Sequence, residues 1–207
     1  MLGSQISSAL AELGARVVVA SRDGEKCKLF AENLRERFPG AAHAGAALDI
    51  TDKESVGKLM ATLTSAGGLD VLVNCSWSGK KNTLDSISEE DWANDIEVSL
   101  NSVFRMCKAA IPLLAKRPGV IVNISSMYGI VAPDYRLYDG ARFANPPSYG
   151  AAKAGVLQFT RYLASFLASQ GIRANCISPG PFPYESTQRE SPEFIARLQE
   201  KNPMHRI

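Results

Sequence analysis

The feature that most constrains this sequence is a regular alternation of short, unbroken apolar runs with longer amphipathic stretches. Apolar runs of strand length occupy residues 16–20, 43–48, 70–74, 119–125 and 172–177. Helical patterns occupy the first thirteen residues and the ranges 24–38, 52–66, a stretch from about 88, a stretch from about 148, and 191–201. Strands that are apolar on both faces and separated by helices form a parallel sheet covered on both sides. The sequence therefore predicts an α/β fold with a doubly wound parallel sheet.

The chain predicts one domain with an unusual beginning. No linker, repeat or low-complexity tract divides it, so we place residues 1–207 in a single Rossmann-like domain. A βαβ unit needs a strand before its first helix, whereas this sequence begins with a helical stripe. We therefore expect a first strand to be missing before Met1. Its absence would leave the strands at 16–20 and 70–74 with unpaired edges inside the sheet.

Two helix starts carry capping signals. Thr51 with Glu54 has the spacing of a capping box for the helix at 52–66, and Ser88 with Asp91 approximates one for the next helix. We expect Thr51 and Ser88 to accept hydrogen bonds from backbone N–H groups in these first turns.

Composition excludes several function classes. Lys and Arg number 23 against 21 Asp and Glu, and the basic residues are scattered, which argues against a nucleic-acid partner. No segment approaches the roughly 18 apolar residues of a membrane span. Four separated cysteines without a CxxC pair, with only two histidines, predict no metal site. Since no secretion signal is visible, we expect a cytoplasmic protein with free thiols.

Three residues suggest acid–base chemistry. Tyr149 and Lys153 lie four residues apart at the start of a predicted helix, and therefore on one face of it. A nearby ammonium favours the phenolate and would bring the Tyr149 pKa closer to neutrality. Ser126 follows an apolar strand, at the edge where α/β sheets bind ligands. Plainer interpretations are a solvated helix face for Tyr149 and Lys153, and a loop hydrogen bond for Ser126.

Six segments, taken in order, resemble the short-chain dehydrogenase/reductase family over essentially the whole chain. They are RVVVASR (16–22), LDI (48–50), VLVN (71–74), VNISS (122–126), YGAAK (149–153) and SPG (178–180). The resemblance implies a nicotinamide-dependent oxidoreductase in which Tyr149 exchanges the proton. It also implies that Lys153 lowers the Tyr149 pKa and binds the nicotinamide ribose. Ser126 would orient the substrate oxygen, and Ser125 is the less suitable serine of the pair.

The sequence departs from the family pattern at several places. The family begins with a strand and a TGxxxGxG loop, of which only Gly3 remains, and it continues with another strand beyond Ile207. Trp77 stands where a glycine usually lets the cofactor approach. The relay asparagine of the family aligns with Ser99, and Asn101 lies two positions on, about 200° around a helix. Whether either residue takes the relay role stays open.

Cofactor choice depends on the residues after the strand at 16–20. Ser21 and Arg22 offer a hydroxyl and a planar cation that suit a 2′-phosphate, whereas an acid there would favour NAD. We expect NADP; NAD is the alternative if Arg22 is an ordinary solvated residue or Asp23 turns inward. The resemblance implies further cofactor contacts at Gly3, Asp49, Ile50, Asn74, Lys153, Pro179 and Gly180. A turn or a helix cap is the alternative role of Asp49.

The 22 residues between Ser126 and Tyr149 contain tyrosines, prolines and charges of both signs. Loops of this length are uncommon unless they are functional or disordered, and the aromatic content argues against disorder. We interpret this insertion as a wall of the substrate site that suits a polyol, sugar acid or nucleotide-sugar. A contact with a neighbouring subunit is the alternative. Residues 179–183 and the following helix would form a lid over the nicotinamide.

The leading hypothesis is an NADP-dependent alcohol dehydrogenase or ketone reductase with a polar, carbohydrate-like substrate. One alternative is an impaired relic of the family that acts as a binding or assembly module, and another is a fragment of a longer active enzyme. The stripe of Val98, Phe104 and Ile111 suits a core or a subunit interface. In the family, the helices that hold this stripe and Tyr149 form a dimer contact, so we expect a homodimer or homotetramer.

Overall fold

The computed structural model describes residues 2–80, 82–138 and 144–207, with five parallel strands in two sheets. Strand β1 (Val18–Ser21) pairs with β2 (Ala44–Ala47). Strand β4 (Val120–Ile124) lies between β3 (Val71–Asn74) and β5 (Arg173–Ile177). The five predicted strands and the α/β parallel architecture are confirmed, with each strand end within two residues of its expected place.

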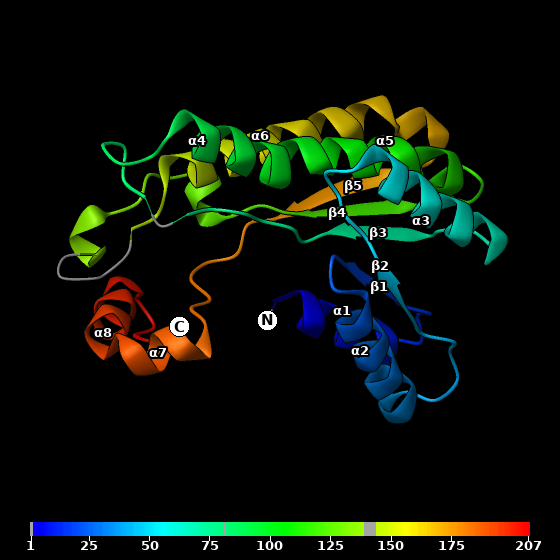
Figure 1. Ribbon diagram of the computed structural model, residues 1–207, viewed down its shortest axis with the longest axis horizontal. Coiled ribbons are helices and arrows are strands. Elements are labelled where there is room, and N and C mark those ends of the chain that lie inside the picture. Colours follow the sequence, from blue (N-terminus) through cyan, green and yellow to red (C-terminus); the bar gives the residue numbers. More distant parts are fainter. Residues whose placement is uncertain (1, 81, 139–143) are drawn as a thin grey trace.

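The predicted break inside the sheet is also confirmed. Among the described residues, β1 is hydrogen-bonded to β2 alone and β3 to β4 alone, so no ladder joins β1 to β3. Figure 1 shows the two sheets as separate groups of arrows. Each of these two edges presents backbone groups that another strand would normally satisfy.

Eight α-helices are described around the strands: α1 (Leu2–Glu12), α2 (Gly24–Arg37), α3 (Lys53–Ser65), α4 (Glu89–Ile96), α5 (Ser102–Leu114), α6 (Pro147–Phe166), α7 (Glu185–Glu190) and α8 (Pro192–Lys201). Helices α5 and α6 run side by side over one face of β3, β4 and β5 (Figure 1). Helix α2 packs on β1 and β2. Helix α7, which the sequence pattern did not predict, precedes α8. None of the described helices combines the length and apolar character needed to cross a bilayer.

One of the two predicted caps is wrong. Asp52, rather than Thr51, caps α3, because its carboxylate accepts hydrogen bonds from the N–H groups of Glu54 and Ser55. The Thr51 hydroxyl donates instead to Asp49. The cap at Ser88 is confirmed, since its hydroxyl accepts from the Asp91 N–H at 3.0 Å.

The main core lies between the three-stranded sheet and its helices, with Ile121, Leu114 and Val156 fully buried. A buried polar chain crosses it. The Asn74 amide donates to the Asn123 side chain at 2.8 Å, and the Asn123 amide donates to the Thr160 hydroxyl at 2.9 Å. These bonds join β3, β4 and α6 beneath the carboxyl edge of the sheet, where paired polar groups fix one arrangement of the elements.

Candidate active site

The carboxyl ends of β3 and β4 meet the first turns of α6, and this junction brings the three predicted catalytic residues together. Ser126 follows β4, and its hydroxyl accepts the Tyr128 N–H at 3.2 Å. Burial raises the pKa of Tyr149, while a hydrogen bond with Ser126 opposes the rise. Ser126 and Tyr149 are therefore neighbours, with two hydroxyls available to hold one substrate oxygen.

Lys153 lies behind this pair and is 2% exposed. Its ammonium donates to the carbonyls of Ile124 at 2.8 Å and Ser76 at 3.1 Å, which joins the ends of β4 and β3. Burial lowers the pKa of Lys153 to about 8. The ammonium lies 5.9 Å from the centre of the Tyr149 ring.

The spacing of Tyr149 and Lys153 predicts a lowered Tyr149 pKa, whereas the structure gives a net shift in the other direction. The Tyr149 pKa is raised, with burial as the largest cause. The ammonium is held against backbone carbonyls over the ring, where its charge does not offset the desolvation of the phenol.

Ser125 has a different task from Ser126. It is buried, and its hydroxyl donates to the Lys153 carbonyl at 2.7 Å. This bond anchors α6 to the end of β4, which leaves Ser126 as the serine beside Tyr149.

A π-helical turn over Glu97–Asn101 joins α4 to α5 and places Ser99 at the site. Ser99 is fully buried; its hydroxyl accepts the Ser78 N–H at 2.9 Å and donates to the Ser78 carbonyl at 3.2 Å. Asn101 is exposed and donates to the Glu97 carboxylate at 2.7 Å. Of the two candidates for the relay position, the structure thus turns Ser99 toward the loop that contacts Lys153. A π turn adds a residue to a helix and often marks a functional site, but no sequence periodicity indicated this one.

The residues after β1 lie at the same carboxyl edge. Arg22 is exposed, and its charge contributes to a lowered Asp49 pKa, so the two side chains are neighbours at the ends of β1 and β2. The Ser21 hydroxyl lies 3.0 Å from the Cys27 sulfur. Asp23 does not turn inward, because it caps α2 by accepting the Lys26 N–H at 3.0 Å.

Several predicted cofactor contacts are occupied within the protein. The Asp49 carboxylate accepts two hydrogen bonds from Thr51, which agrees with its alternative role in a turn. The Asn74 amide points into the core. The Ile50 carbonyl accepts a hydrogen bond from the Arg105 guanidinium. The Pro179 carbonyl accepts one from the Met127 N–H.

The two glycines remain open to a ligand. A methyl group added to Gly3, in the first turn of α1, would meet only the Cys75 sulfur, at 3.8 Å, and one added to Gly180 would meet nothing within 4 Å. Together with exposed Arg22, these positions fit an extended dinucleotide along the carboxyl edge.

Trp77 fills space beside Tyr149 that a glycine at this position would leave open. Its ring meets Tyr149 edge-on, with centroids 6.0 Å apart, and is 47% exposed. The indole is therefore a solvent-accessible neighbour of the candidate proton donor.

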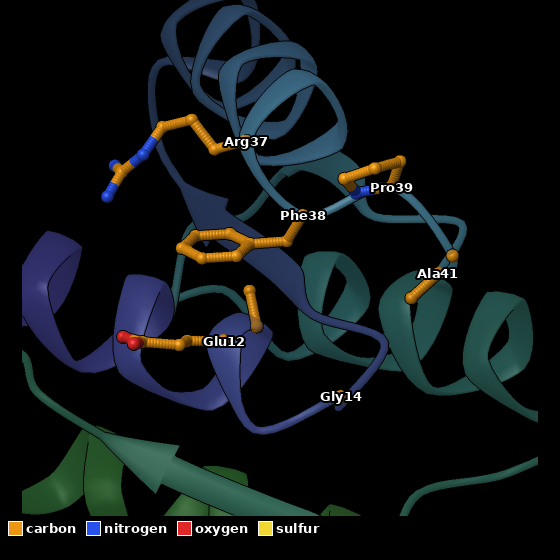
Figure 2. A pocket seen from close by; sticks show the side chains of 8 residues that line it. Glu12, Gly14, Arg37, Phe38, Pro39 and Ala41 are labelled. Atoms are coloured by element: carbon orange, nitrogen blue, oxygen red, sulfur yellow. The ribbon is translucent and has the colours of Figure 1, made fainter.

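A hollow lies on another part of the molecule. It is lined by residues at the ends of α1 and α2, and Figure 2 shows Arg37 and Phe38 above Glu12. Both helix ends lie at the amino-terminal edge of β1, away from Tyr149. Within the described ranges, no group of three or more His, Cys, Asp or Glu side chains is placed to hold a metal ion.

Comparison with known proteins identifies the family. The family model described as "Enoyl-(Acyl carrier protein) reductase" matches residues 2–207. The 3-oxoacyl-[acyl-carrier-protein] reductase FabG of Vibrio cholerae is 32% identical over 181 residues, which are 86% of this chain and 68% of FabG. The chain belongs to the short-chain dehydrogenase/reductase (SDR) family. It is an NAD(P)-dependent oxidoreductase, as the sequence predicted.

Solved SDR structures agree with the fold. A putative gluconate dehydrogenase from Agrobacterium tumefaciens has a TM-score of 0.88 at 28% identity, covering 99% of this chain and 78% of its own. Pseudomonas aeruginosa RhlG, solved with NADP, has a TM-score of 0.84 at 28% identity, and the match covers 99% of this chain and 80% of RhlG. A short chain dehydrogenase from Leptospira borgpetersenii with bound NAD+ has a TM-score of 0.84 at 26% identity, and the match covers 100% of this chain and 75% of the neighbour. Both forms of the cofactor therefore occur among the structural neighbours.

Proposed function

We propose that this SDR transfers a hydride between NADP and a hydroxyl or carbonyl carbon of a small, polar, carbohydrate-like substrate. The observation that carries the proposal is the convergence of Ser126, Tyr149 and buried Lys153 where β3, β4 and α6 meet. These residues hold an oxygen and exchange its proton, which is the acid–base half of an alcohol–carbonyl interconversion.

Each residue has a separate task. The Ser126 and Tyr149 hydroxyls hold the substrate oxygen, and Tyr149 gives or accepts the proton there. Lys153 keeps the ends of β3 and β4 together and offers the ammonium for the nicotinamide ribose. Ser99 orients the loop at Ser78, two residues beyond the Ser76 carbonyl that Lys153 binds. The nicotinamide, when bound, accepts or supplies the hydride.

NADP is favoured by the charges after β1. Arg22 is exposed at the strand end, whereas the Asp23 carboxylate is occupied as the cap of α2. A guanidinium there can pair with a 2′-phosphate through two parallel hydrogen bonds. The same arrangement lacks an inward-facing acid for the ribose hydroxyls of NAD.

The insertion supports a polar substrate. Tyr128 of the insertion and Tyr184, which follows β5, contribute to the raised pKa of Tyr149, and Tyr149 contributes to the raised pKa of Tyr138, so these phenols lie near one another. Phenols offer both stacking faces and hydroxyl groups, a combination common in sugar and polyol sites. The neighbour from Agrobacterium tumefaciens is named a putative gluconate dehydrogenase, which is consistent with a carbohydrate-like substrate in general and does not specify its charge.

Tyr149→Phe tests the proposal because it removes the exchangeable proton and keeps the ring. We expect turnover of polyols with NADP to fall by at least a hundredfold, while NADP binding by calorimetric titration changes little. Activity retained within about tenfold of the wild type would refute the assignment of Tyr149. NADP binding without turnover of polyols or the corresponding ketones by the wild-type chain would favour the binding-module alternative.

A further inference from the structure

The insertion before Tyr149 is docked onto α8 by three kinds of contact. The Arg197 guanidinium donates to the Leu137 carbonyl at 2.9 Å. Lys201 and Asp134 form an ion pair at 3.2 Å. A separate apolar cluster fills the space between them, made of Leu137, Phe194 and Leu198. Residues 134–138 are therefore held by a helix about 60 positions away in the chain, and Figure 1 shows α8 close to this turn.

Tyr138 connects this docked turn to the candidate active site. Its ring packs on Phe194 with centroids 5.4 Å apart, and its hydroxyl lies 3.0 Å from the Tyr128 hydroxyl. Tyr128 in turn donates its N–H to Ser126 and contributes to the raised pKa of Tyr149. The Tyr128–Tyr138 pair thus lies beside the reacting residues.

We propose that the Tyr128–Tyr138 hydroxyl pair is a subsite for a substrate hydroxyl group remote from the reacting carbon. The inference rests on the proposed function and specifies its substrate class as neutral polyols and the corresponding ketoses. Two phenol hydroxyls that share one hydrogen bond offer donor and acceptor capacity together. An alcohol group, which also donates and accepts, complements such a pair.

The surrounding charges favour a neutral ligand over a sugar acid or a sugar phosphate. Burial raises the pKa of Tyr138, and the Tyr128 phenol raises it further, so the pair resists added negative charge. The described cations at the docked turn are already engaged, because Arg136 and Lys201 pair with the Asp134 carboxylate and Arg197 donates to the Leu137 carbonyl. A phosphate or carboxylate on the subsite would need a cation that these contacts already engage.

Matched substrates and variants test the subsite. The probes are the pentitol with the lowest KM among xylitol, ribitol and D-arabitol, and 2-pentanol, which has the same carbon chain without distal hydroxyls. Tyr138→Phe and Tyr128→Phe each keep the ring and lose one hydroxyl. We expect either change to raise the pentitol KM about tenfold, as the loss of one hydrogen bond would, and to change the 2-pentanol KM less than twofold.

Tyr135→Phe is the matched control. Its hydroxyl donates to the Asn145 carbonyl at 3.1 Å, and its ring also contacts Tyr138, but its hydroxyl does not belong to the pair. We expect it to change neither KM. Thermal melts of all three variants check that the docked turn is retained.

The outcomes separate the subsite from the chemistry. An equal rise in KM for pentitol and 2-pentanol, or an equal effect of Tyr135→Phe, would overturn the subsite and assign the pair a structural role. Turnover of 2-pentanol but of none of the pentitols would also overturn it, while the oxidoreductase assignment stands. Loss of the subsite effect leaves the Tyr149→Phe result unchanged, whereas full activity of Tyr149→Phe would refute the proposed function itself.

Discussion

The ammonium of Lys153 is the most deeply buried charge at the candidate active site, and it predicts a specific dependence of stability on pH. Two backbone carbonyls, those of Ile124 and Ser76, accept its hydrogen bonds. They do not fully replace the water that burial removes, so the pKa falls from 10.5 to about 8. Below pH 8 both the folded and the unfolded chain bind this proton, and the cost of burying the charge is fully present.

The sign and size follow from proton linkage. Between pH 8 and 10.5 the folded state releases the proton while the unfolded state still binds it, so the free energy of unfolding rises with pH. For pKa values of about 8 and 10.5, the rise between pH 8 and 9 is about 1 kcal/mol. The raised thiol pKa values of Cys75 and Cys107 act in the opposite direction, because near their ordinary value of 9.0 the unfolded chain releases these protons first. Both thiols remain in Lys153→Met, so the Lys153 contribution is the difference between the slopes of wild type and variant.

Urea unfolding at pH 7.5, 8, 8.5 and 9 measures this effect as a shift in the free energy of unfolding. Lys153→Met keeps most of the side-chain volume and removes the titrating group, so its stability should lack the rise. Lys58→Met is the control, because Lys58 is exposed on α3, and it should keep the wild-type pH dependence. The same slope in wild type and Lys153→Met would refute a folded-state pKa near 8.

Two further predictions concern the cofactor and the assembly. Arg22→Ala should weaken NADP binding by about 1.5–3 kcal/mol, the usual value of a charge-assisted hydrogen bond, and should have little effect on NAD binding. Calorimetric titration with each cofactor measures both changes. Equal losses of affinity for NADP and NAD would assign Arg22 a structural role. We also propose that α5 and α6 form a homodimer interface, because Phe104, Tyr162 and Phe166 are 50%, 56% and 58% exposed and their aromatic contacts run through Phe159. Phe166→Glu should shift sedimentation from dimer to monomer, and a monomeric wild type would contradict the proposal.

The sequence was sufficient to predict a structural feature wherever that feature depends on interactions between residues close together in the chain. Strand and helix order follows from the spacing of apolar residues, and all five strands lie where that spacing predicts them. The four-residue spacing of Tyr149 and Lys153 fixes their common helix face. The position of Ser126 could be predicted because it lies two residues after the end of β4. Even the break between β1 and β3 could be predicted, because it depends only on the order of elements.

Local patterns failed where neighbouring residues compete. Thr51 and Asp52 are adjacent, and both residue types cap helices well, so the capping-box spacing alone selected the wrong one. At Asn74, the motif suggests a cofactor contact, and the packed core supplies Asn123 of β4 and Cys107 of α5 as partners of its side chain.

The remaining features depend on groups brought together from distant parts of the chain. Ser99, rather than Asn101, faces the loop at Ser78 because of a π turn and a hydrogen bond with the Ser78 backbone 21 residues away. The Tyr149 pKa is raised because packing removes water from the phenol, an effect that no spacing between Tyr149 and Lys153 contains. Sequence periodicity thus determined the elements and the catalytic spacing, whereas desolvation and long-range hydrogen bonds, which exist only in the packed molecule, decided how those residues are charged and oriented.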